Sequence, residues 1–476
     1  MDEILMTEKT EKIVYFGESR GRRTFRPDVT EPRAPATIID DDTLTDGQRE
    51  AIDMYRRGDC FFLSGSGGTG KSYLIHHIIR EANRGGRKIA VTAMTGCAAV
   101  LLNCGAKTLH SWAGIGLGGE PVDAYVQKIR SSGILKKRWV QCETLIIDEV
   151  SMLTGELLDK LDEIARRVRG INHPFGSIQL ILVGDFFQLP PISKVSIRKY
   201  YAFESNFWQE AVKQRVILTV IHRQTDPIFV DILNSVRFGS INPDQIAVLE
   251  TRRVKSVEDI TGEIKPTQLY TMNIDVDNIN TYELDRLEGP VIRSVASTSI
   301  GPIVSHLPEH SINTAIAVMD KSMPYTVVLQ MKVGAQVMLV TNLDFTRGLV
   351  NGSRGIIVAF TPKTSIPIVK FRNGIEMMID RQEWASEEYP DLIRRQYPLR
   401  LAWASTIHKM QGQSLDCVAI DCGSSVFEYG QTYVALSRVR SLEGLWLIDF
   451  DPTKIKAHPK ITEFYEKLVE TPAEKE

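Results

Sequence analysis

The sequence predicts an α/β protein with two parallel-sheet cores, and three observations support this class. The chain has 476 residues, which is more than a single hydrophobic core usually serves. Short apolar runs alternate with amphipathic stretches along much of its length, a pattern typical of parallel strands covered by helices on both faces. A glycine-rich loop motif directly follows the first run. We therefore expect at least one nucleotide-binding sheet.

Five apolar runs predict the strands of a first core, and the stretches 72–82 and 154–168 predict helices between them. The runs are CFFLS (60–64), KIAVT (88–92), TLII (144–147), QLILV (179–183) and VILTVI (216–221). A second set predicts a second core: QLYTM (268–272), LRLAWA (399–404), DCVAID (416–421) and LWLIDF (445–450).

A segment of different texture interrupts the second set. It contains AQVMLVT (335–341), GIIVAF (355–360), PIVKF (367–371) and EMMID (376–380). Asn351-Gly352 and Asn373-Gly374 punctuate these runs, and Asn-Gly between β-rich runs is a strong hairpin signal. We expect a small β-barrel inserted into the second core.

The composition is that of an ordinary globular protein, with 43% hydrophobic and 24% charged residues. The formal net charge of -2 lends no support to a nucleic-acid partner. Basic clusters that could line a groove are Arg20, Arg22 and Arg23, then Lys136, Lys137 and Arg138, and finally Arg394 and Arg395. A solvated surface is the alternative for each cluster.

Several signals point to a soluble intracellular protein, nuclear or cytoplasmic, with no membrane partner. The six cysteines form no CxxC pair, and no run of about 18 apolar residues occurs. The acidic opening resembles neither a secretory signal nor a transit peptide. Residues 1–42 and 471–476 predict tails, and the RGRR at 20–23 is either a basic address or part of an inert solubilising tail.

The glycine-rich loop matches GxxxxGK[ST] between a predicted strand and a predicted helix. Its backbone N–H groups would cradle phosphates at a helix N-terminus. Lys71 would bridge the β- and γ-phosphates of ATP, and Ser72 would bind Mg²⁺. The predicted nucleotide-binding residues are Gly65, Ser66, Gly67, Gly68, Thr69, Gly70, Lys71 and Ser72.

Polar residues at the ends of two further strands complete the expected site. Asp148 and Glu149 follow TLII, at the sheet edge where parallel sheets bind ligands. Asp148 suits the Mg²⁺ shell, and Glu149 would accept a proton from the attacking water or orient it. Gln188 follows QLILV with Asp185 and either contacts the γ-phosphate or satisfies loop backbone.

The ordered series of motifs resembles the PIF-type DNA helicases, within helicase superfamily 1B and related to RecD. The resemblance covers about 44–465. Its motifs are LTDGQREAID (44–53), GSGGTGKS (65–72), VTAMTGCAA (91–99), AKTLHSWAGIG (106–116), IIDEVSML (146–153), VGDFFQLPP (183–191), HRQTDPIF (222–229), GLVNGSRGIIVAF (348–360), LAWASTIHKMQGQSLD (401–416) and YGQTYVALSRVRS (429–441).

The resemblance implies two RecA-like P-loop NTPase cores in tandem with an SH3-like β-barrel in the second. The expected ranges are 43–225 for the first core, with a wedge at about 105–140, then 226–330 and 397–470 for the second core, and 331–396 for the barrel. It also implies that Gln48 recognises adenine and that Arg223 and Arg438 reach the γ-phosphate from the second core.

Residues matching family DNA contacts lie along the tops of both cores. They are Thr92, Thr95, Gly96, Thr108, His110, Thr406, His408 and Lys409. Such side chains suit sequence-independent phosphate contacts. Trp112 and Trp403 would stack on bases or, as we expect, pack in the core.

The expected function is therefore an ATP- and Mg²⁺-dependent DNA helicase, moving 5′ to 3′ on single-stranded DNA and unwinding duplex DNA. Single-stranded and forked DNA are the expected partners of a monomeric motor in replication, repair, recombination or telomere maintenance. An RNA helicase or a single-strand translocase without unwinding is the alternative. A scaffold with inactive nucleotide binding, or a kinase or signalling NTPase with one core, explains fewer of the motifs.

Overall fold

The computed structural model describes residues 44–470 except 117, 192–197, 345 and 387–388. The predicted tails and the RGRR at 20–23 lie outside these residues. No helix among the residues described is long and apolar enough to cross a membrane.

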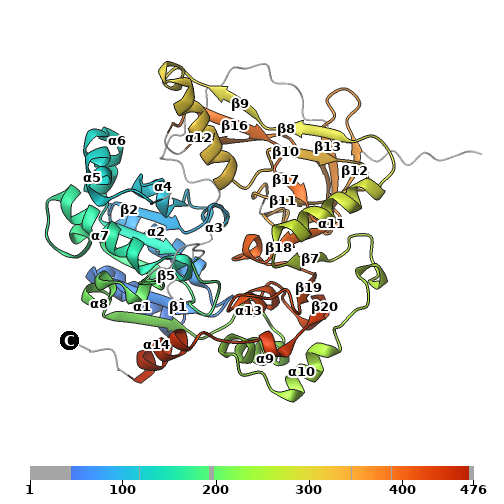
Figure 1. Cartoon of the computed structure of the whole chain (residues 1–476), viewed down its shortest axis with the longest axis horizontal. Coiled ribbons are helices and arrows are strands. Elements are labelled where there is room, and N and C mark those ends of the chain that lie inside the picture. Colours follow the sequence, from blue (N-terminus) through green and yellow to red (C-terminus); the bar gives the residue numbers. More distant parts are fainter. Residues whose placement is uncertain (1–43, 117, 192–197, 345, 387–388, 471–476) are drawn as a thin grey trace, which may run out of the picture. The chain divides into compact units, whose positions relative to one another are not determined.

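The first core is a six-stranded parallel sheet (Figure 1), formed by the five predicted runs and one short strand that was not predicted, β3. In spatial order its strands are β3 (Lys107–Thr108), β2 (Ile89–Ala93), β4 (Thr144–Asp148), β5 (Gln179–Val183), β1 (Phe61–Gly65) and β6 (Gln214–Leu218). Its helices are α1 (Asp46–Arg57), α2 (Lys71–Arg84), α3 (Gly96–Leu101), α4 (Leu109–Ala113), α5 (Val122–Ser131), α6 (Gly133–Gln141), α7 (Gly155–Arg169) and α8 (Asn206–Ala211).

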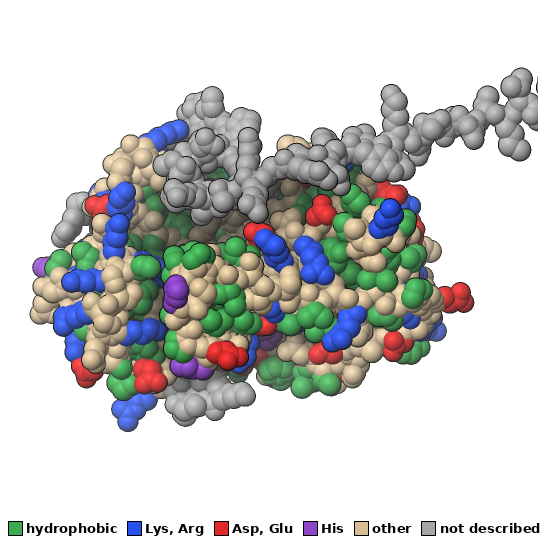
Figure 2. Space-filling view, turned by 90° about the horizontal axis from the view of Figure 1, so that it is seen from above, with side chains coloured by type: hydrophobic (Ala, Val, Ile, Leu, Met, Phe, Trp, Pro, Cys, Tyr) green, Lys and Arg blue, Asp and Glu red, His purple; other side chains and the backbone are tan. Residues whose placement is uncertain are grey.

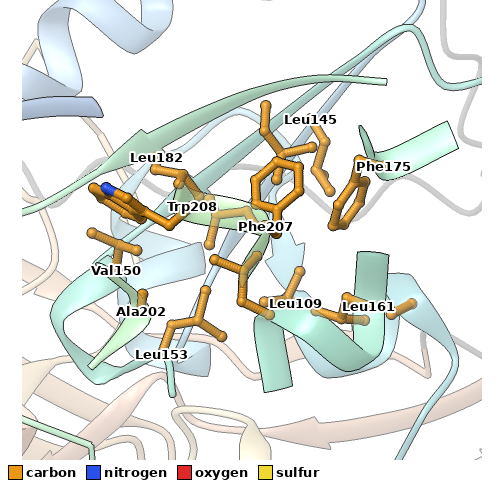
Figure 3. Close-up of a cluster of buried hydrophobic side chains, with 14 of the residues drawn as sticks. Leu109, Leu145, Val150, Leu153, Leu161, Phe175, Leu182, Ala202, Phe207 and Trp208 are labelled. Atoms are coloured by element: carbon orange, nitrogen blue, oxygen red, sulfur yellow. The ribbon is translucent and has the colours of Figure 1, made fainter. Parts of the chain in front are cut away.

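Burial of entire strands fixes this sheet. Every residue of β1, β4 and β5 is buried. On one face Leu145 and Leu182 point toward Leu161 of α7 and Phe207 of α8 (Figure 3). Because such a sheet is covered on both sides, its loops alone reach solvent, and polar residues gather where the strands end.

The second core is a four-stranded parallel sheet. Its strands in spatial order are β18 (Ala404–Thr406), β7 (Thr267–Tyr270), β19 (Val418–Cys422) and β20 (Leu445–Phe450). The helices of this half of the chain are α9 (Pro227–Phe238), α10 (Pro243–Glu250), α11 (Asn273–Arg286), α12 (Glu309–Ser322), α13 (Gln431–Leu436) and α14 (Pro459–Glu470).

A five-stranded antiparallel sheet interrupts the second core. Asn373-Gly374 forms one of its hairpin turns, whereas Asn351-Gly352 forms a turn within the longer connection 340–353. Gly352 and Gly374 have φ values of 92° and 84°, which glycine adopts without strain. The strands are β14 (Glu376–Met378), β13 (Pro367–Phe371), β12 (Arg354–Phe360), β11 (Gln336–Leu339) and β17 (Leu399–Leu401). The antiparallel insertion agrees with the sequence; an SH3-like barrel remains a prediction.

Strand pairing differs from the predicted ranges in two places. The run LRLAWA divides into β17, which pairs with β11, and β18, which pairs with β7. Residues 292–300, which were expected in the second core, lie outside its parallel sheet, in two small antiparallel sheets. The pairs are β8 (Ile292–Val295) with β10 (Val328–Met331), and β9 (Ser297–Ile300) with β16 (Leu392–Gln396), which also pairs with β15 (Gln382–Ala385).

The last helix also differs from the predicted range, because the apolar side chains of α14 pack mainly on the first core. Phe464 stacks on Phe203 with ring centroids 4.2 Å apart. The Tyr465 hydroxyl lies 2.7 Å from Ser64 Oγ on β1. The apolar side of α14 is thus buried against a sheet whose first strand lies about 400 positions earlier in the chain.

A buried ion pair joins the cores. Asp185, directly after β5, accepts hydrogen bonds of 2.9 and 2.8 Å from Nε and Nη2 of Arg237 on α9. Both side chains are at most 8% exposed. Burial alone would lower the pKa of Arg237, but Asp185 raises it above the ordinary value. Breaking such a pair leaves an uncompensated buried charge.

We predict that Arg237→Ala lowers the free energy of unfolding by about 3–5 kcal/mol, because Asp185 would stay buried without its cation. Thermal and urea unfolding measure the loss. The control is Arg286→Ala, which removes the exposed ion pair with Glu258 and should leave the midpoint unchanged. Equal midpoints for the two variants would contradict this role of Arg237.

Candidate nucleotide and nucleic-acid site

The phosphate loop joins β1 to α2, and its backbone requires glycine. Gly68 and Gly70 have φ values of 92° and 88°, in the left-handed region that side chains rarely adopt. Gly70 precedes the first residue of α2, a helix of 14 residues. The loop N–H groups therefore lie at a helix N-terminus, where the helix dipole favours phosphate.

Lys71 folds back onto this loop. Its Nζ donates to the carbonyl oxygens of Gly65 at 2.7 Å and Ser66 at 3.0 Å. Burial lowers the pKa of the ammonium, and the nearby Asp185, Glu149 and Asp148 oppose that shift. Next to it, the Ser72 side chain is exposed and available to a ligand.

The two carboxylates predicted after β4 lie at this edge of the sheet. Asp148 is 8% exposed, and burial, followed by the charge of Glu149, raises its pKa to about 7. Glu149 has a φ of 55°, an uncommon conformation for a residue with a side chain that often marks functional positions. Its Oε2 accepts a 2.9 Å hydrogen bond from Gln411 of the second core.

Gln188 and Gln48 are both buried. The Gln188 backbone N–H donates to the Asp185 backbone carbonyl at 2.9 Å, so the Gln188 backbone is held beside the buried ion pair. Gln48 Oε1 accepts from Thr45 N at 3.0 Å in the capping box of α1. Its Nε2 lies 2.9 Å from where a Cβ on Gly70 would be. The amide group of Gln48 therefore faces the phosphate loop.

Arg223 lies against the loop, but on a segment different from the one expected. It follows β6 of the first sheet, where His222 N donates to Gly68 O at 2.9 Å. Its Nη1 is 3.6 Å from a Cβ position on Gly67 and donates to Ser437 O of the second core at 3.2 Å. Pairing of β6 with β1 thus delivers Arg223 from the connection between the cores.

Arg438 is held within the second core. Its Nε donates to Val434 O, its Nη1 to Met410 O and Gln413 O, and its Nη2 to Ser437 Oγ, at 2.6–3.2 Å. The residue is 1% exposed. Burial, followed by the charge of Arg223, lowers its pKa to about 9. The structure therefore brings Arg223 to the loop and leaves Arg438 bonded to its own core.

Three residues near the loop received no role from the sequence. Tyr433 on α13 accepts from Gly67 N at 3.0 Å and approaches Asp185 Oδ2 at 3.4 Å. Tyr465 on α14 lies 3.3 Å from Asp185 Oδ1. Arg237 completes this group, which we call the Asp185 cluster. Its members lie more than 50 positions from Asp185, so local spacing carries no signal for them.

Several predicted DNA contacts of the first core have side chains that already make hydrogen bonds within the protein. The Thr92 hydroxyl is buried and donates to Ile146 O at 2.8 Å. Thr95 and Thr108 cap α3 and α4, and Gly96 begins α3. His110 lies on α4, and burial lowers its pKa. Thr92 is therefore a sheet residue here, whereas the two helix starts lie at the edge where a ligand could bind.

The second core contributes the end of β18. Thr406 is 3% exposed and accepts from Lys409 N at 3.3 Å. Burial lowers the pKa of His408, whereas the Lys409 side chain is exposed. A Cβ on Gly412 would lie 3.1 Å from Leu101 of α3. The structure thus brings the segments after β18 and around α3 together.

The exposure of the basic residues and of the two tryptophans decides between some of the alternatives given for them. Arg394 pairs with Asp320 and is 6% exposed, so it cannot line a groove. Lys136 and Lys137 on α6 are exposed. Trp112 and Trp403 are 4% and 9% exposed and pack in the core, as expected. Basic and acidic side chains are interspersed on the face shown in Figure 2.

Comparison with known proteins agrees with this arrangement. The model of the PIF1-like helicase family matches residues 43–245, and that of the DNA helicase Pif1 2B domain matches 318–360. The ATP-dependent DNA helicase PIF1 of Danio rerio is 40% identical over 428 residues, covering 89% of this chain and 64% of that protein. The chain thus spans somewhat less than two thirds of this relative.

Solved structures extend the similarity to the fold. The Pif1 helicase from Candida albicans is 36% identical, with a TM-score of 0.74, covering 89% of this chain and 99% of that one. The Bacteroides Pif1 helicase in complex with ADP-AlF3 and single-stranded DNA is 28% identical, with a TM-score of 0.63 and coverages of 89% and 97%. The α/β class with RecA-like cores is confirmed, and the chain belongs to the PIF1-like helicase family.

Proposed function

We propose that this chain is an ATP-dependent DNA helicase that translocates 5′ to 3′ on single-stranded DNA and unwinds duplexes. One observation carries the proposal: atoms of the phosphate loop and of its flanking Arg223 bond directly to the second core. Gly67 N donates to Tyr433, and Arg223 donates to Ser437 O. A phosphate that bonds to Gly67 N or to Arg223 would therefore alter contacts between the cores, which is what a motor requires.

The similar proteins support the choice of ligands. The Bacteroides Pif1 helicase binds ADP-AlF3 and single-stranded DNA, and the Danio rerio relative is named as an ATP-dependent DNA helicase. Forked DNA is the substrate of a further Pif1 structure that covers 89% of this chain. We extend ATP, single-stranded DNA and forked DNA to this chain, and we assign it to replication, repair, recombination or telomere maintenance.

The nucleotide roles follow from placement around the loop. Lys71 would exchange its two loop carbonyls for β- and γ-phosphate oxygens, which are stronger partners for an ammonium. Gln48 would contact adenine. Glu149 would take the proton of the attacking water, oriented with Gln188. Arg223 would stabilise charge on the transferred phosphoryl, and Arg438 would join it once its carbonyl partners are released.

The residues present fit Mg²⁺. Asp148 is a buried carboxylate whose raised pKa reflects burial and the neighbouring Glu149, so a cation there would favour its ionised form. The described residues contain no group of three or more potential protein ligands. That agrees with Mg²⁺ held by one carboxylate, the Ser72 hydroxyl, phosphates and water. The ion would neutralise charge on the phosphates.

DNA would bind across the two segments that meet at Gly412. Helix starts at Gly96 and Leu109 and the exposed Lys409 offer backbone N–H groups and a cation to phosphates. None of these groups reads a sugar, so RNA translocation remains the second candidate. Helices α4 to α6 occupy the region expected to act as a wedge. We propose a monomeric motor because all candidate arginines come from this chain.

We predict that Lys71→Ala reduces DNA-stimulated ATP hydrolysis by about 100-fold or more, because the site loses its cation for the developing charge. Steady-state phosphate release measures this. Lys255→Ala, at an exposed lysine, is the control and should retain wild-type rates. Intact hydrolysis in Lys71→Ala would disprove the assignment of the site.

We predict that Asp148→Asn weakens the pH dependence of stability in nucleotide-free and Mg²⁺-free protein. Because the folded-state pKa of Asp148 is raised from 3.8 to about 7, the folded protein retains a proton that the unfolded chain releases. The contribution of Asp148 to stability therefore falls as pH rises from about 4 to 7. Between pH 5 and 8 the wild type should lose about 2 kcal/mol more than the variant.

Urea unfolding at the two pH values measures this difference. The exposed Asp277→Asn on α11 is the matched control and should keep the wild-type dependence. An equal pH response in Asp148→Asn and the wild type would show that Asp148 is not the titrating group.

We predict that ATP and Mg²⁺ support opening of a partial duplex with a 5′ tail and not of one with a 3′ tail. A fluorescence unwinding assay compares the two tails on DNA and, in parallel, a forked RNA. Opening of the 3′-tailed duplex alone would contradict the direction. Equal or faster opening of the RNA fork would favour the second candidate.

A further inference from the structure

The Gly67 N–H of the phosphate loop is already occupied by the second core. It donates a 3.0 Å hydrogen bond to the hydroxyl of Tyr433. Tyr433 lies on α13 and is 3% exposed, whereas Gly67 is half-buried, so the tyrosine side chain is enclosed while the loop stays accessible. A loop whose N–H groups bind phosphate thus has one of these groups capped by a side chain of the opposite core.

Gly67 lies at the end of the loop where the terminal phosphate is expected. It is the third residue of the motif, four positions before Lys71. The guanidinium of Arg223 is 3.6 Å from a Cβ position on this glycine, and we assigned Arg223 to the transferred phosphoryl. One N–H makes one good hydrogen bond. A phosphate oxygen at Gly67 and the Tyr433 hydroxyl therefore compete for the same donor.

The Tyr433 hydroxyl has a second partner that remains when the first is lost. It lies 3.4 Å from Asp185 Oδ2, and Arg237 holds Asp185 in place. Displacement from Gly67 thus costs one hydrogen bond without leaving the hydroxyl unpaired in a buried site. An exchange of this kind is reversible, because both arrangements satisfy the buried polar groups.

We propose that Tyr433 discriminates ATP from ADP: its hydroxyl occupies the terminal-phosphate position at Gly67 and is displaced by the γ-phosphate but not by ADP. The proposal rests on the proposed function. Binding of ATP then breaks a direct bond between the cores, and loss of the γ-phosphate restores it. Tyr433 links the presence of that phosphate to the contact of α13 with the loop.

The test compares Tyr433→Phe with Tyr465→Phe. Both tyrosines are buried and contact Asp185, but the hydrogen bonds of Tyr465 go to Ser64, Phe186 and Asp185 and not to the loop. Fluorescence titrations measure the affinities for ADP and for a non-hydrolysable ATP analogue with Mg²⁺ and without DNA. Tyr433→Phe should bind the ATP analogue about three- to tenfold more tightly. Its ADP affinity should be unchanged, as should both affinities of Tyr465→Phe.

Unchanged or weaker binding of the ATP analogue by Tyr433→Phe would overturn the proposal. So would an equal gain for ADP or for Tyr465→Phe. A wild-type protein that binds neither nucleotide would instead refute the proposed function. If Tyr433→Phe does not fold, hydrogen–deuterium exchange of the wild type decides: the ATP analogue should raise exchange in α13, and ADP should not. Equal exchange with both would refute the role of Tyr433.

Discussion

The buried Asp185–Arg237 ion pair is the contact on which the rest of the site depends. Asp185 is fully buried, and a carboxylate in that position requires a cation and further donors. Arg237 supplies two hydrogen bonds, and its guanidinium lies over the ring of Phe187 at 4.6 Å from the centroid. Because Asp185 belongs to the first core and Arg237 to the second, the cost of an unpaired buried charge keeps the two cores in contact beside the phosphate loop.

The polar groups of the phosphate loop lie next to this ion pair. Lys71, the one ionisable side chain of the loop motif 65–72, lies in the field of Asp185, Glu149 and Asp148. Its ammonium is satisfied by the Gly65 and Ser66 carbonyls, and Gly67 N–H by Tyr433. Two of the donors expected to hold phosphates, Lys71 Nζ and Gly67 N–H, are thus engaged within the protein. Nucleotide binding becomes an exchange of partners, and its free energy is the difference between two sets of hydrogen bonds.

A second link between the cores lies on the other side of the carboxylates. Glu149 accepts from Gln411, and Gln411 directly follows His408 to Met410, the turn that presents the predicted DNA contacts. Glu149 is thus both the candidate base for water and the hydrogen-bond partner of the segment 408–411. Any movement of that segment on DNA would free or hold this carboxylate, which offers a physical route for DNA to stimulate hydrolysis.

The sequence by itself determined the two parallel sheets, the antiparallel insertion with its Asn-Gly turns and the phosphate loop, because each is encoded by neighbouring residues: apolar periodicity, turn glycines and a motif between a strand and a helix. The tertiary structure alone decided that α14 packs on β1, that LRLAWA divides between two sheets, and that Arg223 arrives from the inter-core connection. It also assembled the Asp185 cluster, whose members come from segments up to 280 positions apart. Such contacts depend on which buried polar groups can satisfy one another once the cores close, and no local pattern records that.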